Sequence, residues 1–130
     1  FVSTREELNV NVYVIDIDGQ NLRRLTENPA EDFTPEWSPD GGQIAFVSRN
    51  VHDGGSLKVH LMNADGSGMN SLGGNRVVDQ TPSWSPDGQQ IVFASTSGSS
   101  FDIFVMEADG ENVRQLTRNR DDDWGPVWRP

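Results

Sequence analysis

A five-residue stretch that occurs twice in this chain constrains its fold more than any other feature. Trp-Ser-Pro-Asp-Gly stands at residues 37–41 and again at residues 84–88, so the two copies are 47 residues apart. A shortened copy, Trp128-Arg129-Pro130, follows 44 residues after the second. Spacings of this length indicate a repeat architecture in which each unit is one supersecondary structure.

Other landmarks keep the same period. The Asp-Gly pairs at residues 18–19, 65–66 and 109–110 are also 47 and 44 residues apart. Three similar tripeptides also step along the chain: Phe1-Val2-Ser3, Phe46-Val47-Ser48 and Phe93-Ala94-Ser95. Because independent landmarks agree, we interpret the whole chain as a set of repeats.

Each repeat is predicted to form four short strands, which we letter A to D. In the last complete repeat the turns fall at Pro86-Asp87-Gly88 and at Asp109-Gly110, residue types that favour tight turns. The strands between them are rich in β-branched and aromatic residues: 81–85, 90–95, 101–106 and 112–117. No stretch shows a helical period with caps, so the pattern predicts an all-β chain.

A unit of four strands that recurs after 47 and then 44 residues has the size of a β-propeller blade. With the Trp-Ser-Pro-Asp-Gly box, the sequence resembles the WD-like propeller repeat of the TolB family and of the propellers in prolyl-oligopeptidase-type and tricorn-type proteases. The resemblance rests on these segments: 34–41, 44–48, 59–66 and 103–110. It implies a propeller fold but is a poor guide to activity, because unrelated functions share such folds.

The repeats predict a single domain, 1–130, of antiparallel four-stranded blades. Residues 1–25 would be the end of strand B with strands C and D of a split blade, and 126–130 its strand A. Complete blades are expected at 33–72 and 81–117.

About three blades cannot close a ring, since propellers have four to eight. The TolB resemblance implies six blades, so we expect a homodimer in which residues 126–130 pair with the partner's first blade at 9–25. The alternative is a fragment of a larger propeller, TolB-like or hydrolase-associated.

The charge balance excludes some partners. The net charge is −10, which disfavours nucleic acid and anionic membrane surfaces because both bind Lys/Arg-rich patches. There is no cysteine, so thiolate metal sites are excluded, and no apolar run is long enough to insert in a membrane. No signal peptide is recognised. Because the sequence begins within a repeat, the alternative that a leader peptide has been removed is left open.

Three aspartates precede the strand A proline by three residues: Asp32, Asp79 and Asp123. They are predicted to line the tunnel mouth, where oxygen ligands would suit Ca²⁺ or Mg²⁺. The alternative, which we favour, is that each caps its own loop and that the protein has no cofactor. Trp124 has no equivalent, because Phe33 and Gln80 take its place in the other repeats. It is a candidate ligand-binding aromatic near the same mouth, and the alternative, which we favour, is simple packing.

The remaining aromatic residues are interpreted as structural. Trp37, Trp84 and Trp128 are expected to pack between neighbouring sheets, and His60, which aligns with Tyr13 and Phe104, is expected in the core. No Ser-His-Asp set or Gly-x-Ser-x-Gly elbow is present, so no catalytic residue is predicted.

These observations favour a non-enzymatic scaffold that binds a protein or peptide through loops on one face. The loops are 27–32, 49–56, 74–79, 96–100 and 118–123. The alternatives are a small-molecule or cation site at the acidic tunnel mouth and a propeller enzyme. The family resemblance implies a periplasmic or other extracytoplasmic location.

Overall fold

The computed structural model describes residues 1–5, 9–50, 54–74, 78–97 and 99–129. Within these ranges it contains strands and no helix, which confirms the all-β prediction. The strands are β1 (Val2–Ser3), β2 (Asn11–Val14), β3 (Arg23–Arg24), β4 (Glu31–Trp37), β5 (Gln43–Asn50), β6 (Ser56–Asn63), β7 (Asn70–Ser71), β8 (Asp79–Trp84), β9 (Gln90–Ser97), β10 (Ser100–Glu107) and β11 (Arg114–Gln115).

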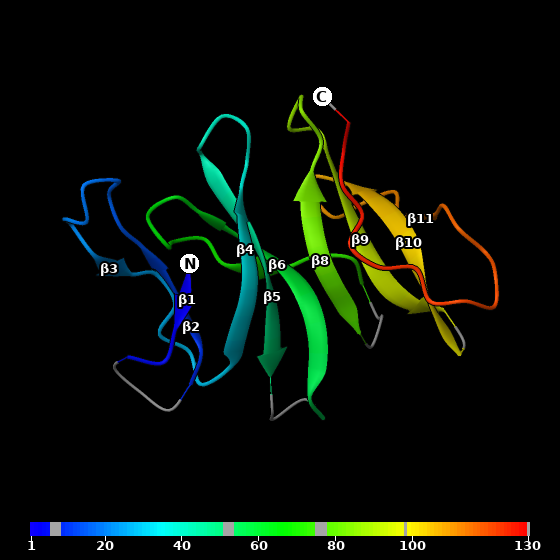
Figure 1. Ribbon diagram of the computed structural model, residues 1–130, viewed down its shortest axis with the longest axis horizontal. Helices are drawn as coiled ribbons and strands as arrows, with labels where there is room; N and C mark the ends of the chain where they lie inside the picture. The colour runs from blue at the N-terminus through cyan, green and yellow to red at the C-terminus, as the bar shows by residue number, and fades with distance from the viewer. Residues whose placement is uncertain (6–8, 51–53, 75–77, 98, 130) are drawn as a thin grey trace.

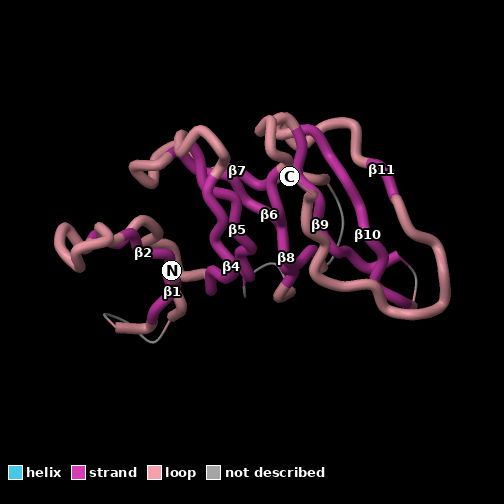
Figure 2. The backbone as a smooth tube through the Cα atoms, turned by 45° about the horizontal axis from the view of Figure 1, so that its top comes forward, coloured by secondary structure: helices cyan, strands magenta, loops and turns pink. Residues whose placement is uncertain are grey.

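The strands form three antiparallel sheets that stand side by side (Figures 1 and 2). The first sheet has the order β1-β2-β3, the second β4-β5-β6-β7 and the third β8-β9-β10-β11. The second and third sheets are four-stranded meanders, as predicted for complete blades, and the first lacks a strand equivalent to β4. This arrangement is that of consecutive propeller blades.

The central strands of the second sheet, β5 and β6, contribute to two cores, because successive side chains of a strand point to opposite faces. On β5, Ile44 and Phe46 pack with Val12 and Leu25 of the first sheet. Ala45, between them in sequence, packs instead with residues of the third sheet. We call these two cores the first seam and the second seam.

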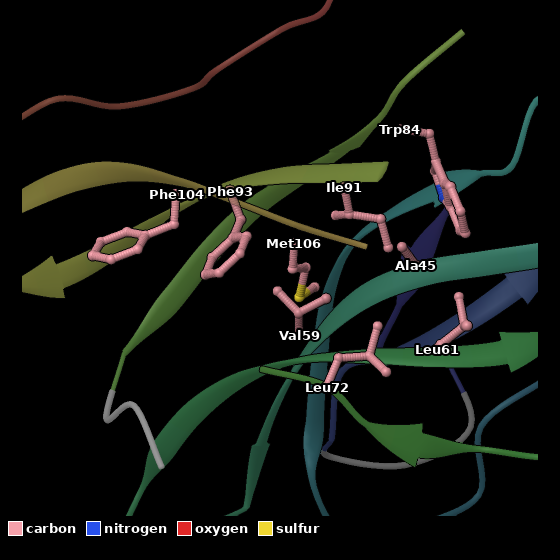
Figure 3. Packing of buried hydrophobic residues seen from close by; sticks show 9 residues of the cluster. All are labelled: Ala45, Val59, Leu61, Leu72, Trp84, Ile91, Phe93, Phe104 and Met106. Atoms are coloured by element: carbon pink, nitrogen blue, oxygen red, sulfur yellow. The ribbon is translucent and has the colours of Figure 1, made fainter. Parts of the chain in front are cut away.

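The second seam is the larger core (Figure 3). It contains nine buried hydrophobic side chains from the second and third sheets: Ala45, Val59, Leu61, Leu72, Trp84, Ile91, Phe93, Phe104 and Met106. Apolar burial of this kind is the main force that holds neighbouring blades together.

The repeated Ser-Pro-Asp-Gly sequence forms the same turn in both complete blades. Asp40 accepts hydrogen bonds from the Ser38 hydroxyl at 2.6 Å and from the Gly42 N–H at 3.0 Å, and the Ser38 hydroxyl accepts one from the Gln43 N–H at 2.9 Å. The Ser85 and Asp87 side chains repeat this arrangement. The box is therefore structural, and its polar residues hold the turn rather than a ligand.

A second repeated feature is a bulge in strand A. The ladder between β4 and β5 shifts between Phe33 and Glu36, and that between β8 and β9 shifts at the corresponding point. Thr34 and Thr81 adopt positive φ angles of 48° and 49° at these bulges. The third repeat has Gly125 there, with φ 58°, a conformation that glycine adopts without steric cost.

The sequence prediction for Trp37 was wrong in this chain. Trp84 is 5% exposed in the second seam, whereas Trp37, at the equivalent position of β4, is 45% exposed. The physical reason is that the first sheet has no strand A beside which the Trp37 ring can pack.

Residues 126–129, predicted as strand A of the split blade, form no ladder within one chain. They run beside the third sheet, where the Trp128 indole N–H donates a hydrogen bond to the Ser83 carbonyl oxygen at 3.1 Å. Their pairing with the first blade of a second copy stays a prediction, as do the domain divisions.

Candidate binding face

The loops predicted to bind a partner leave the sheets at one edge. The strands β4 and β8 begin at this edge, and β5 and β9 end there; it is the lower edge in Figure 1. We call it the entry face. Parts of these loops, residues 51–53, 75–77 and 98, lie outside the described residues.

Asp32 lies at the start of β4 and is completely buried. Neither of its carboxylate oxygens accepts a hydrogen bond of ordinary geometry. Burial raises the pKa of Asp32, and the nearby Ser48 and Thr26 hydroxyls and the charges of His60 and Arg24 only partly offset that rise. A fully buried carboxylate is poorly placed to meet a ligand in solution, so the structure indicates a role inside the first seam.

The other two aspartates differ from one another. Asp79 is 1% exposed at the start of β8. Asp123 is half-buried, and its carboxylate accepts a hydrogen bond from the Asn119 side chain at 2.8 Å while its backbone N–H bonds to the Phe101 carbonyl. The Asn119 contact fits a loop-stabilising role for Asp123.

Among the described residues, no three Asp, Glu, His or Cys side chains are close enough together to hold a metal ion. Asp32, Asp79 and Asp123 therefore do not form a cation site within one copy of the described chain. Their ring across two copies stays a prediction, as does the binding of Ca²⁺ or Mg²⁺.

His60 packs its ring against Phe46 with 5.6 Å between ring centroids. Its Nδ1 is 3.1 Å from the Lys58 carbonyl oxygen. Burial lowers the pKa of His60, and the neighbouring Asp32 opposes this effect. Burial thus favours the neutral ring, and the residue is half-buried against Phe46 and not fully enclosed in a core.

Trp124 is a surface aromatic, as the sequence suggested. Its side chain is 52% exposed, and its ring lies 4.0 Å from that of Phe101, tilted by 32°. The indole therefore covers the beginning of β10 at the entry face. Whether it also contacts a ligand stays a prediction.

Strands β4 and β8, together with residues 125–127, form a shallow hollow of about 290 Å³, which we call the inner-strand hollow. Its wall repeats three times, once from each strand A segment: Thr34-Pro35-Glu36, Thr81-Pro82-Ser83 and Gly125-Pro126-Val127. In a closed ring these segments would face the central tunnel. Glu36 also ties two sheets together, because its carboxylate accepts hydrogen bonds from the Ser83 hydroxyl and the Trp84 N–H, both at 3.2 Å.

A second pocket, of about 280 Å³, lies between the second and third sheets at the entry face. It is lined by Phe33, Thr34, Val47, Arg49, Leu57, Gln80 and Thr81. The sequence analysis did not identify this pocket. The signal was present in the alignment of repeats, where polar Gln80 takes the place of an aromatic residue, but the consequence depends on the packing of two sheets. We call it the seam pocket.

The family model of the TolB beta propeller domain matches residues 1–130, the whole chain. The chain belongs to this family. The match confirms the TolB-type repeat inferred from the sequence and agrees with the arrangement of the three sheets.

Individual relatives match in part. The Tol-Pal system protein TolB of Geobacter sulfurreducens is 43% identical over 44 residues, which is 34% of this chain and 10% of that protein. The solved structure of a putative TolB from Agrobacterium tumefaciens superposes with a TM-score of 0.73 at 26% identity, covering 89% of this chain and 46% of that chain. The chain thus spans less than half the length of these relatives.

The same fold also occurs beside enzymes. A puromycin hydrolase structure superposes with a TM-score of 0.70 at 19% identity, over 94% of this chain and 20% of that chain. This likeness shows the fold alone. Within the described residues, no helix is long and apolar enough to cross a membrane.

Proposed function

We propose that this chain is a non-enzymatic propeller scaffold that binds a protein or peptide at the entry face. The observation that carries the proposal is the pair of adjoining depressions there, the seam pocket and the inner-strand hollow. The seam pocket and two of the three walls of the hollow are lined mainly by strand residues. A surface held by sheets loses little conformational entropy when it binds a partner.

The lining of these depressions supports binding more than catalysis. It consists of apolar, hydroxyl, amide and proline side chains with Arg49 and Glu36 as its charged members. Glu36 already accepts two hydrogen bonds, and Arg49 is paired with Glu31. The Ser83 hydroxyl does lie within hydrogen-bond distance of the Glu36 carboxylate in the hollow. That carboxylate also accepts the Trp84 N–H, so we interpret the contact as a link between two sheets.

The family supplies the wider setting. Because curated relatives are Tol-Pal system proteins TolB, we propose that the partner is a protein or peptide and that the chain works in the periplasm. The partner and the location are inferred from complete TolB proteins, which are longer than this chain. We propose them for this chain because it belongs to the same family.

The binding face would be complete in a closed ring. The exposed Trp37 on one flank and the 50% exposed Leu116 on the other are positions that a neighbouring blade covers elsewhere in the chain. Either further blades of a larger propeller or a second copy in a six-bladed homodimer would cover them. Chromatography with light scattering distinguishes the two, since the homodimer requires twice the 14.4 kDa mass.

Peptide display on the immobilised chain tests the proposed function. Selected peptides should compete with one another and lose at least about tenfold in affinity when Thr34 and Thr81 are both changed to Arg, which would crowd both depressions. Substitution of Asp40 by Asn, at the opposite edge, is the control and should leave binding unchanged. Failure to select any peptide, or equal binding by both variants, would contradict the proposal.

A further inference from the structure

One repeat departs from the others at a position that lines the seam pocket. Phe33, Gln80 and Trp124 occupy the same place in successive repeats, directly before the left-handed residue of the strand A bulge. In the ladders, Phe33 lies opposite Val47 and Gln80 lies opposite the corresponding residue Ala94. Two of the three positions are therefore aromatic and the middle one is an amide.

The next repeat shows what an aromatic residue does at this place. The Trp124 ring lies against Phe101, with 4.0 Å between ring centroids. Phe101 is the second residue of β10, and Leu57 is the second residue of β6, so the two are equivalent. An aromatic ring thus covers the start of β10 on the outer side of the third sheet. The matching surface over Leu57 is part of an open pocket.

We propose that the seam pocket binds an aromatic side chain of a peptide partner, which takes the place over Leu57 that Trp124 takes over Phe101. The inference rests on the proposed function and specifies its ligand. Phe33, Val47 and Leu57 supply the apolar wall, and aromatic rings bury a large apolar area with few rotatable bonds.

The charges around the pocket favour an aromatic residue with basic neighbours. Arg49 lines the pocket and its side chain is 44% exposed, so its guanidinium can lie over the face of a bound ring. Arg49 is neutralised by Glu31, however, and the chain as a whole carries a net charge of −10. Long-range attraction therefore favours a basic peptide.

The shape of the surface gives the peptide backbone a path. Thr34 and Thr81 line both the seam pocket and the inner-strand hollow, so the two depressions adjoin one another. A peptide lying in the hollow can place one side chain in the pocket. The absence of an aromatic side chain at position 80 thus indicates both the kind of ligand side chain and the pocket that would bind it.

The direct test uses N-acetyltryptophanamide as the probe, titrated into the ¹⁵N-labelled 130-residue chain. We expect dissociation in the range of about 1 mM, with the largest amide shifts at Leu57, Gln80 and Thr81. N-acetylleucinamide should bind more weakly. Shifts centred away from these residues, or equal affinity for the two amides, would overturn the proposal.

A reciprocal exchange supplies the matched variants. Gln80→Trp should fill the pocket from within, weaken the probe by at least about tenfold and leave the fold intact, because Trp124 already occupies the equivalent place. Trp124→Gln should expose Phe101 and create a second set of shifts around that residue. A folded Gln80→Trp chain that binds the probe as well as the wild type would contradict the inference.

The same variants separate this inference from the proposed function. Suppose that the peptides selected by display contain no aromatic residue and bind the Gln80→Trp variant as tightly as the wild type. That result would contradict the aromatic site but would still support the scaffold function. Probe binding that Gln80→Trp abolishes, together with no selectable peptide, would support the pocket and contradict the scaffold function.

Discussion

The second seam and the open flanks of this molecule contain the same kinds of residue in very different surroundings. Trp84 and Leu72, within the second seam, are 5% and 3% exposed. Trp37 and Leu116, their counterparts in other repeats, are 45% and 50% exposed. The comparison teaches that in a propeller the repeat determines the sheet, while the neighbouring blade determines whether a hydrophobic residue stabilises it.

The largest difference is expected between the two tryptophans. Trp84→Ala should cost about 3–5 kcal/mol of unfolding free energy, because it leaves a cavity in the larger core. Trp37→Ala should cost less than about 1 kcal/mol, since its ring is half in solvent. Urea denaturation of the 130-residue chain measures both values.

If the two variants lose similar amounts of unfolding free energy at low protein concentration, the comparison is contradicted. If a second copy covers Trp37, however, the cost of Trp37→Ala should rise with protein concentration, because association stabilises the folded state by mass action. The same denaturation series, repeated over a range of concentrations, therefore also tests the homodimer.

The leucines should repeat this contrast at a smaller scale. Leu72→Ala is expected to cost about 2–5 kcal/mol, whereas Leu116→Ala should stay within about 1 kcal/mol. Thermal unfolding of the two variants, which carry the same chemical change, isolates the effect of the missing neighbour. A large loss in Leu116→Ala would show that this flank is covered in solution.

Asp32 allows a comparison by pH between the buried seam and the exposed turn. Because burial raises the pKa of Asp32 above its ordinary 3.8, its contribution to stability is full below pH 3.8 and is lost as pH rises through the folded-state pKa. An Asn at position 32 does not ionise, so the Asp32→Asn variant does not lose this stability as pH rises. Stability of the variant relative to the wild type should therefore increase as pH rises.

Asp40→Asn should show the opposite dependence. The Ser38 hydroxyl and the Gly42 N–H lower the pKa of Asp40 below 3.8, so its stabilisation is present above pH 3.8 and is lost as pH falls through the folded-state pKa. Urea midpoints measured across the pH range check both signs. Parallel curves for the two variants would contradict the assignment of one to the seam and the other to the turn.

The smallest effect is expected at the strand A bulge. Thr34→Gly should stabilise the chain by up to about 1 kcal/mol, because its positive φ strains a side chain with a Cβ. Thr96→Gly, in an ordinary part of β9, should destabilise it by about 0.5–1 kcal/mol. Melting temperatures of the pair test the claim, and destabilisation by both would show that the bulge carries no strain.

Much of the fold could be predicted from the repeat. The spacing of the Trp-Ser-Pro-Asp-Gly boxes gave the number of sheets, and the Asp-Gly pairs marked the hairpins that the structure contains. The ends of strands were less accurate; the strand predicted from Thr81 begins at Asp79. The bulge explains the difference, because pairing resumes on its other side and the sequence pattern is interrupted there.

The binding face was less predictable, for a physical reason. A repeat compares each residue with its counterparts along the chain, whereas a pocket depends on residues that face one another across two sheets. Asp32 was expected near a tunnel mouth, and its complete burial in one chain could not be inferred from its place in the repeat. The sequence comparison aligned Gln80 and Phe33 with Trp124, but the pocket that Gln80 lines also requires Leu57 and Val47 from the neighbouring sheet.

The alternation of side chains on β5 has a consequence for how the molecule comes apart. Ile44 and Phe46 belong to one core while Ala45 belongs to the next, so a single strand couples both seams. Such a chain behaves as a short one-dimensional lattice with nearest-neighbour coupling. Unfolding should then fray inward from the outer sheets, with the central β5–β6 hairpin the last to exchange its amide hydrogens with solvent.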